Sequence, residues 1–270
     1  MFEQIILGII QGVAEWLPVS SEGMIVLIKS NFFPSTTPLA EVIIKQALFL
    51  HLGTFFAALV YFRREVGELL KALFNYRKAS AETQKLFGFL FISTMISGCL
   101  GILLLKGLTE FVGQFESSTR TINFLIGLLL IVTAYLELKA HTPGHRLTKD
   151  LKTSDAVILG IVQGFAVLPG LSRSGLTVSA LLLRKFEKID SLRLSFLMSL
   201  PIVLAGNIIL NINSFHCELY AFIGLLCAFI FGLLTIHLLL KLAEKINFGY
   251  FILVFAFLMI ISCFVPVNTP

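Results

Sequence analysis

The residues that could do chemistry gather in two short segments, and the first runs from Gln11 to Ser21. Gln11 and Glu15 are four residues apart, so both side chains would lie on one face of a helix. A proline-containing break at residues 16–18 follows, and Ser20 with Ser21 can cap the next short helix. A helix N-terminus presents free N–H groups and a positive dipole end, which favour an anion. This segment therefore offers a carboxylate beside an anion-binding turn.

The second segment reads Pro-Gly-Leu-Ser-Arg-Ser-Gly-Leu-Thr over residues 169–177. Arg173 supplies a planar fork of donors that matches phosphate oxygens. Gly170 and Gly175 allow the backbone to approach a ligand closely. Three hydroxyl groups stand on the same turn or first helical turn, at Ser172, Ser174 and Thr177.

A carboxylate in one segment and an arginine with hydroxyls in the other predict a compact phosphate site. Because Glu15 alone would repel phosphate, we interpret it as a metal ligand or a proton acceptor. The predicted catalytic residues are Glu15, Ser21 and Arg173. The predicted substrate-binding residues are Gln11, Ser20, Ser172, Ser174 and Thr177. Attack on phosphorus by Ser21 and attack by a water molecule both stay open.

Structural interpretations of the same residues compete with this one. Serines beside proline often only cap helices, which applies to Ser20 and Ser172. Arg173 could be a structural partner of Glu15 in a neutral buried pair. His51, in the first long apolar segment, is interpreted as a packing or interface residue. The break and its hydroxyls occur twice at matched positions, which favours the functional interpretation.

The composition indicates that lipid surrounds these segments. Of the 270 residues 57% are hydrophobic and 14% are charged, against roughly 45–50% and a quarter in soluble domains. The net charge of +5 is spread over short polar segments, which excludes a nucleic-acid-binding patch. We therefore predict an all-α integral membrane protein. Six segments are long enough to cross a bilayer core of roughly 30 Å, at 41–62, 86–106, 119–139, 191–213, 218–240 and 248–266.

The polar connections predict the orientation of these spans. Lysine and arginine gather in the connections 63–85, 140–152, 184–193 and 241–247. By contrast, 107–118 and 214–218 carry glutamate without lysine or arginine. Since basic loops stay on the cytoplasmic side, we predict a multi-pass protein of the inner (plasma) membrane with both termini outside.

Two further apolar segments, 2–31 and 154–184, each hold two short helical runs around a Pro–Ser turn. Such runs are too short to cross singly and favour re-entrant hairpins. Residues 7–14 (Leu-Gly-Ile-Ile-Gln-Gly-Val-Ala) match residues 159–166 (Leu-Gly-Ile-Val-Gln-Gly-Phe-Ala). A hairpin and three spans make each unit, and three is odd, so the second unit is inverted. We predict one membrane domain over 1–270, with repeats 1–140 and 150–270 and a site where the two breaks meet.

The segments 11–21 and 169–177 resemble the two signatures of the undecaprenyl-pyrophosphate phosphatases linked to bacitracin resistance. The resemblance covers essentially the whole chain, including His51-Leu52-Gly53-Thr54. It implies hydrolysis of undecaprenyl pyrophosphate to undecaprenyl phosphate and phosphate, which recycles a carrier for cell-wall polymers. It also implies a divalent cation, magnesium or calcium, and a site that opens externally. The expected partners are the lipid pyrophosphate and membrane lipids; a homodimer is left open.

Met24 departs from the family pattern, in which a histidine proposed to assist catalysis usually follows the Ser-Ser-x-Gly run. A thioether cannot take a proton, so the role of that histidine is absent or moved. Glu15 and a metal ion would then activate Ser21 or water, or turnover would be reduced. The competing hypothesis is a polyprenyl-phosphate flippase on the same scaffold with little or no phosphatase activity.

Overall fold

The computed structural model describes residues 1–33, 46–114, 119–140, 144–168, 170–211, 219–242 and 248–264. These ranges form helices joined by turns, and they contain no strand, which confirms the predicted all-α class. The helices are α1 (Phe2–Ala14), α2 (Ser21–Phe32), α4 (Leu48–Tyr61), α5 (Arg63–Phe74), η2 (Tyr76–Lys78), α6 (Ala81–Gln114), α7 (Thr119–Lys139), η3 (Thr148–Asp150), α8 (Thr153–Phe165), α9 (Arg173–Leu183), α10 (Lys188–Asn211), α11 (Leu219–Leu242) and α12 (Phe248–Ser262).

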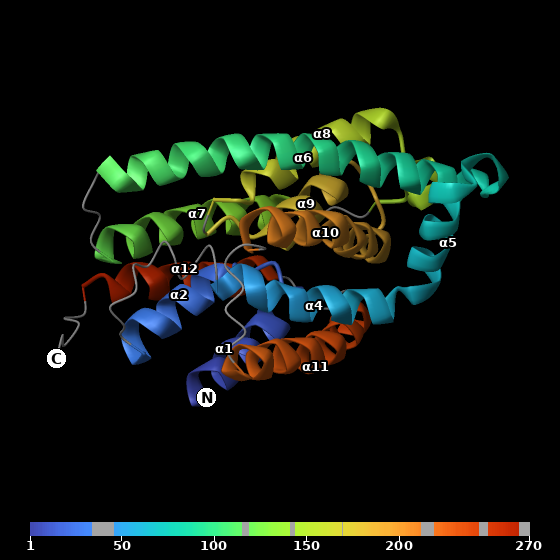
Figure 1. The fold of residues 1–270 in the computed structure, drawn as a ribbon. Helices are drawn as coiled ribbons and strands as arrows, with labels where there is room; N and C mark the ends of the chain where they lie inside the picture. The colour runs from blue at the N-terminus through green and yellow to red at the C-terminus, as the bar shows by residue number, and fades with distance from the viewer. Residues whose placement is uncertain are drawn as a thin grey trace.

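Long helices dominate the molecule and run roughly side by side (Figure 1). Among the described residues, three helical stretches are long and apolar enough to cross a membrane, at Ala81–Gly107, Lys188–Ile209 and Leu219–Lys241. Their lipid-exposed faces carry large apolar side chains such as Leu103, Ile209 and Leu234. This arrangement is that of a multi-pass membrane protein. The number of spans stays a prediction, because the segments 34–45, 214–218 and 243–247 and the tail after 264 lie outside the described residues.

Two pairs of short helices occupy the segments predicted as hairpins. α1 and α2 stand on either side of a break at residues 15–20, and α8 and α9 on either side of residues 166–172. Each second helix begins at a serine cap. The Ser20 hydroxyl accepts a hydrogen bond from the Gly23 N–H at 3.1 Å, and the Ser172 hydroxyl accepts one from the Gly175 N–H at 3.2 Å. Such caps satisfy one of the free donors at a helix start.

The first helix of each pair packs on a long helix through glycines. A Cβ atom at Gly8 of α1 would lie 2.2 Å from the carbonyl oxygen of Gly224 in α11. At Gly160 of α8, it would lie 2.8 Å from Cβ of Ile96 in α6. Small residues permit this close helix packing in membranes. Each hairpin thus packs on the middle span of the opposite predicted repeat; the repeat and its inversion stay predictions.

Ion pairs hold the two helices of each short-helix pair together at the end away from the break. Lys29 in α2 lies 3.0 Å from Glu3 in α1. In the second pair Asp155, in the first turn of α8, accepts hydrogen bonds from Arg146 and from Arg184 at the end of α9. Burial raises the pKa of the Asp155 carboxyl, but the hydrogen bonds from both arginines outweigh burial and hold that pKa below its usual value. The second hairpin is therefore closed by a fully buried carboxylate and the first by a partly exposed one.

The connection 63–85, whose secondary structure the sequence analysis left open, is helical over most of its length. α5 and η2 fill it, and α6 begins at Ala81. In Figure 1, α5 crosses the end of α4 and α6. Apolar residues recur at helical spacing among its charges, at Val66, Leu69, Leu70 and Leu73, which is the pattern of an amphipathic helix.

Candidate active site

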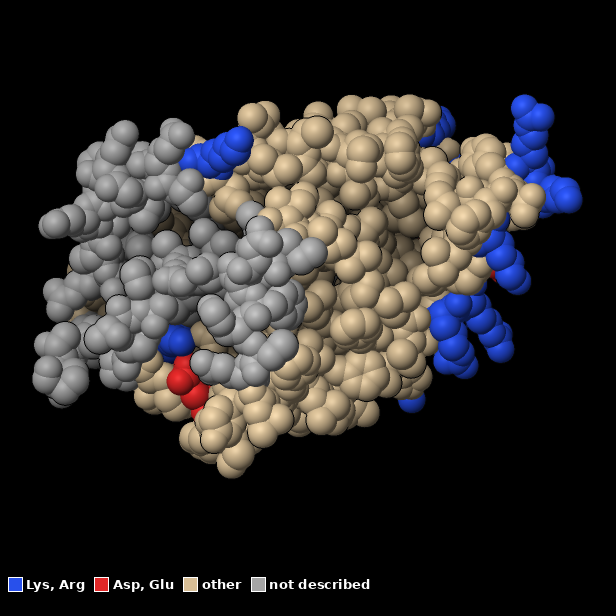
Figure 2. All heavy atoms as spheres, in the orientation of Figure 1, with Lys and Arg blue, Asp and Glu red and all other residues tan. Residues whose placement is uncertain are grey.

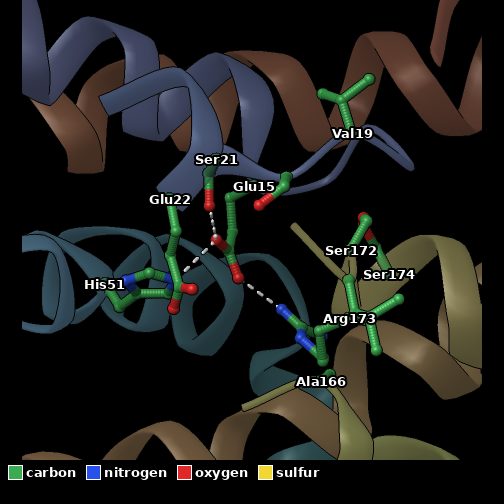
Figure 3. Close-up of a pocket in the computed structure, with 11 residues that line it drawn as sticks. Glu15, Val19, Ser21, Glu22, His51, Ala166, Ser172, Arg173 and Ser174 are labelled. Carbon is green, nitrogen blue, oxygen red and sulfur yellow. Dashed lines mark hydrogen bonds and ion pairs between the residues drawn. The ribbon is translucent and has the colours of Figure 1, made fainter. Parts of the chain in front are cut away.

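The two breaks meet around one pocket, and six of the eight predicted site residues line it. The pocket takes side chains from the first break and the start of α2, from α4, and from the second break and the start of α9. Its polar lining residues are Glu15, Ser20, Ser21, Glu22, His51, Ser172, Arg173 and Ser174. Figure 3 shows Glu15 at the centre, with Ser21 and His51 on one side and Arg173 on the other.

Both oxygens of Glu15 have partners, and the side chain is 5% exposed. Oε1 accepts a hydrogen bond from Nη2 of Arg173. Oε2 accepts hydrogen bonds from Nε2 of Gln11 at 2.8 Å and from Oγ of Ser21 at 3.0 Å. Nε2 of His51 lies 3.1 Å from the same oxygen. A buried carboxylate is tolerated only with partners of this kind, so the first hairpin requires the second at this point.

Arg173 is held in place by a second contact. Its Nη1 donates to the carbonyl oxygen of Ser195 in α10 at 3.1 Å, while Nη2 is bound to Glu15. The guanidinium lies at the first residue of α9, where the free N–H groups of a helix start also favour an anion. This position gives the pocket a fixed positive charge and leaves further N–H groups of the fork for a ligand.

Hydroxyl groups tie the two breaks together. Ser174 donates to the carbonyl oxygen of Leu17 at 2.6 Å, and its Oγ lies 3.3 Å from Oγ of Ser172. Gly170 adopts a φ of +97°, in the left-handed region where glycine is favoured. A Cβ there would lie 2.7 Å from the carbonyl oxygen of Ile126. The second break thus needs glycine to place its serines against the first.

Two predicted binding residues lie behind the pocket and do not line it. Gln11 is fully buried and holds Glu15 from the side of α1. Thr177 is also fully buried; its Oγ1 donates to the carbonyl oxygen of Arg173 at 2.8 Å and lies 2.6 Å from Oγ of Ser195. Their observed contacts position Glu15 and Arg173. Direct contact of either residue with substrate stays a prediction.

His51 was missed by the sequence analysis, which interpreted it as packing. The residue lies in α4, and its Nδ1 is 2.6 Å from the carbonyl oxygen of Ala47. A carbonyl can only accept, so Nδ1 carries the hydrogen and Nε2 faces Glu15. An ionisable residue inside an apolar helix is a functional candidate by default, and that signal was available. Glu22 was also not selected, and its carboxylate lines the same pocket.

Met24 is turned away from this site. It packs against the apolar cluster of α1, α2, α7 and α12 that includes Val26, Ile126 and Leu130, and it does not line the pocket. A histidine at position 24 would replace an apolar contact in this backbone arrangement. The imidazole of the described site comes instead from α4.

The donor chemistry of the pocket fits a divalent cation, although the described residues hold no cluster of three or more His, Cys, Asp or Glu side chains that would bind one alone. Magnesium prefers oxygen ligands and usually takes one or two carboxylates together with substrate phosphates. Glu15 and Glu22 supply carboxylates here. Oε1 of Gln11 is buried and has no hydrogen-bond partner in the described part of the chain, but Gln11 lies behind the pocket lining.

Comparison with known proteins identifies the family. A family model described as "Bacitracin resistance protein BacA" matches residues 4–261. The chain belongs to this family. It is 43% identical to an undecaprenyl-diphosphatase of Methanococcoides burtonii, over 97% of this chain and 98% of the relative. Undecaprenyl-diphosphatases of Haloarcula marismortui and Methanococcus vannielii are 39% and 35% identical, over 90% and 92% of this chain and 90% and 95% of each relative.

The BacA family match agrees with the resemblance first noted in residues 11–21 and 169–177. These are the segments that the fold brings together at the pocket. Membership of the family therefore agrees with the residues of the pocket as well as with the sequence of the whole chain. The phosphatase names of the relatives also agree with a pocket that combines a carboxylate, a serine and an arginine.

Proposed function

We propose that this BacA-family protein hydrolyses undecaprenyl pyrophosphate to undecaprenyl phosphate and inorganic phosphate. The observation that carries the proposal is the single junction at Glu15, whose two oxygens contact Arg173 from one hairpin and Ser21 from the other. The guanidinium of Arg173 supplies a positive charge there. The hydroxyl of Ser21 lies beside the Glu15 carboxylate, which can accept its proton. These are the groups that phosphoryl transfer requires.

Binding of the pyrophosphate is assigned to the second hairpin and the start of α2. Arg173 and the free N–H groups of α9 face the terminal phosphates. Ser20 accepts a backbone hydrogen bond through Oγ, so its own hydroxyl hydrogen is available to a phosphate oxygen. Ser172 also accepts one, but its hydrogen is directed to Ser174, because Ser174 donates its own to Leu17. The prenyl chain stays in the bilayer, and the lipid carrier is thereby returned to cell-wall polymer synthesis.

The chemical step begins at Ser21 or at a water molecule in its place. Oγ of Ser21 donates to Oε2 of Glu15 at 3.0 Å, so Glu15 is placed to take the proton as the oxygen attacks the terminal phosphorus. The bond to the bridging oxygen breaks, and its electron pair leaves with undecaprenyl phosphate. Attack by Ser21 would leave a phosphoserine, which trapping with labelled substrate detects; a water molecule would then hydrolyse it to inorganic phosphate and restore the Ser21 hydroxyl.

A magnesium or calcium ion is part of the proposal. Glu15 would hold it, with Glu22 beside it. The ion supplies positive charge against the phosphate oxygens. Removal of divalent ions with a chelator should abolish phosphate release, and restoring magnesium or calcium should recover it.

We further propose that the site opens to the external face of the plasma membrane, with both termini outside. The distribution of basic connections along the chain supports this orientation. A homodimer stays a prediction. The flippase alternative is not favoured, because the full-length relatives are named diphosphatases and Ser21 is held on a carboxylate.

Phosphate release by the detergent-purified protein tests the proposal. We expect Glu15→Ala and Arg173→Ala each to lower kcat/KM by about 10³-fold or more, because each removes a group that acts on the reacting phosphate. Glu65→Ala and Arg193→Ala are matched controls, since these residues form a partly exposed ion pair of 3.1 Å outside the pocket. A folded wild-type protein that releases no phosphate, with its metal supplied, contradicts the proposal.

A further inference from the structure

The helix α5 and the turn η2 together form a segment, residues 63–78, that the catalytic proposal does not use. Figure 1 shows α5 crossing the end of the long helices rather than running beside them. Phe62 alone separates α5 from α4, so the segment starts where an apolar helix of 14 residues ends. With the long helices across a bilayer, α5 lies along its surface.

The acidic side of α5 faces the protein. Glu65 pairs with Arg193 of α10 at 3.1 Å, and Glu68 accepts a hydrogen bond from Thr83 of α6 at 3.4 Å. Both glutamates line a cavity between α5, α6 and α10. Apolar residues on this side pack inward: Val66, Leu69 and Ala72. The negative charges of the segment are therefore turned away from its outer face.

The outer face is both apolar and basic. Leu70, Leu73 and Phe74 are 55%, 59% and 81% exposed. All five basic residues of the segment are exposed beside them, at Arg63, Arg64, Lys71, Arg77 and Lys78. Figure 2 shows lysine and arginine gathered at this end of the molecule. Long basic side chains beside exposed leucine and phenylalanine form the face of a helix that lies in a lipid interface.

An aromatic row joins this face to the lipid-exposed surface of α6. Tyr76 contacts Phe87 with ring centroids 5.8 Å apart, and Phe87 stacks on Phe91 at 6.5 Å. Phe91 is 58% exposed. Tyrosine is enriched at membrane interfaces, where its ring is buried and its hydroxyl is wet. The outer face is thus continuous with surface that acyl chains cover, which favours lipid over a soluble protein as its occupant.

We propose that residues 63–78 bind the anionic phospholipid surface of the leaflet at this end of the protein. Leu70, Leu73 and Phe74 enter the boundary between headgroups and acyl chains. The exposed arginines and lysines contact the phosphates of anionic headgroups. The segment carries five basic residues against two glutamates, and both glutamates are bonded to α6 or α10; this excess of positive charge gives the charge complementarity on which the preference rests.

Tryptophan fluorescence of the full chain in lipid nanodiscs tests the position of the face. The chain has one tryptophan, Trp16, which is buried, so Phe74→Trp adds a second, distinguishable emission. We expect brominated lipids to quench the added emission strongly and aqueous iodide to quench it weakly. Strong quenching by iodide, or by neither agent because a second copy covers the face, overturns the proposal.

The preference for anionic lipid is tested in the same Phe74→Trp background. In mixed nanodiscs, quenching should be stronger when the phosphatidylglycerol is brominated than when the phosphatidylcholine is. Arg64→Gln with Lys71→Gln should abolish that difference. Lys149→Gln with Lys152→Gln removes two exposed charges elsewhere and should leave it unchanged. Equal quenching by the two lipids, or equal loss in both double variants, overturns the proposal.

Discussion

Both hairpins begin their second helix with a serine that accepts a hydrogen bond from a glycine N–H, at 3.1 Å for Ser20 and 3.2 Å for Ser172. Both also carry a glutamine at the same position of the first helix. Gln11 donates to Glu15, whereas Gln163 donates to Ser97 of α6 at 3.1 Å. The backbone plan is therefore shared, while the polar contacts at its centre differ.

The two hairpins differ in the residue that stands one helical turn after each glutamine. The first hairpin has Glu15 there and the second has Val167, while only the second has an arginine at the start of its second helix. Without the other hairpin, Glu15 and Arg173 would each be buried without the opposite charge that now pairs with it, which is unfavourable. Together they place a carboxylate and a guanidinium at one junction. The two hairpins thus share one backbone plan while each supplies a different half of one site.

The largest effect is expected from substitutions of the carboxylates at the ends of the hairpins, which change the free energy of unfolding. Asp155→Asn leaves Arg146 and Arg184 without their buried carboxylate, and we expect it to lower the free energy of unfolding by about 3–5 kcal/mol. Glu3→Gln, at the matched position of the first hairpin, should cost about 1 kcal/mol or less, since Glu3 is partly exposed. Denaturant titration in detergent measures both changes. Equal losses would mean that the two ends are held alike.

Substitution of His51 tests whether Glu15 of the first hairpin also depends on α4 for its position. His51→Ala removes the imidazole beside Oε2 of Glu15, and we expect kcat to fall about 10²-fold because the carboxylate is less well positioned. His51→Gln keeps a donor there and should recover part of the rate with KM little changed. His237→Gln, an exposed histidine on α11, is the matched control. Wild-type rates in both His51 variants would limit this residue to packing.

The smallest effects on activity and stability are expected from substitutions of Gln11 and Gln163. Gln11→Ala removes a hydrogen bond to a charged group, and we expect kcat/KM to fall about 10-fold. Gln163→Ala removes a neutral hydrogen bond to Ser97 and should lower the free energy of unfolding by about 1 kcal/mol with kcat/KM unchanged. Phosphate release and denaturant titration on both variants check this contrast. A matching loss of activity would place the second glutamine in the site as well.

The sequence alone indicated where the site residues lie along the chain. Apolar length indicated a membrane protein, because backbone groups in lipid must be satisfied within helices. The Pro–Ser turns marked both breaks, and a carboxylate and an arginine at those breaks marked the chemistry. The matched glycines of residues 7–14 and 159–166 are also visible as a local repeat. Each of these signals is contained in short segments of the sequence.

The tertiary structure decided which residues meet. Glu15 and Arg173 are 158 positions apart; the repeat predicted that their breaks meet, but which atoms pair there comes from the fold. His51 reaches Glu15 because α4 packs between the first hairpin and α10, and Met24 misses the pocket because its face of α2 packs on α7. Likewise, the sequence marked 63–85 only as a basic connection, and the structure shows that Glu68 and Glu65 of α5 bond to α6 and α10. Helix packing sets these distances, and sequence periodicity gives only the face on which each residue lies.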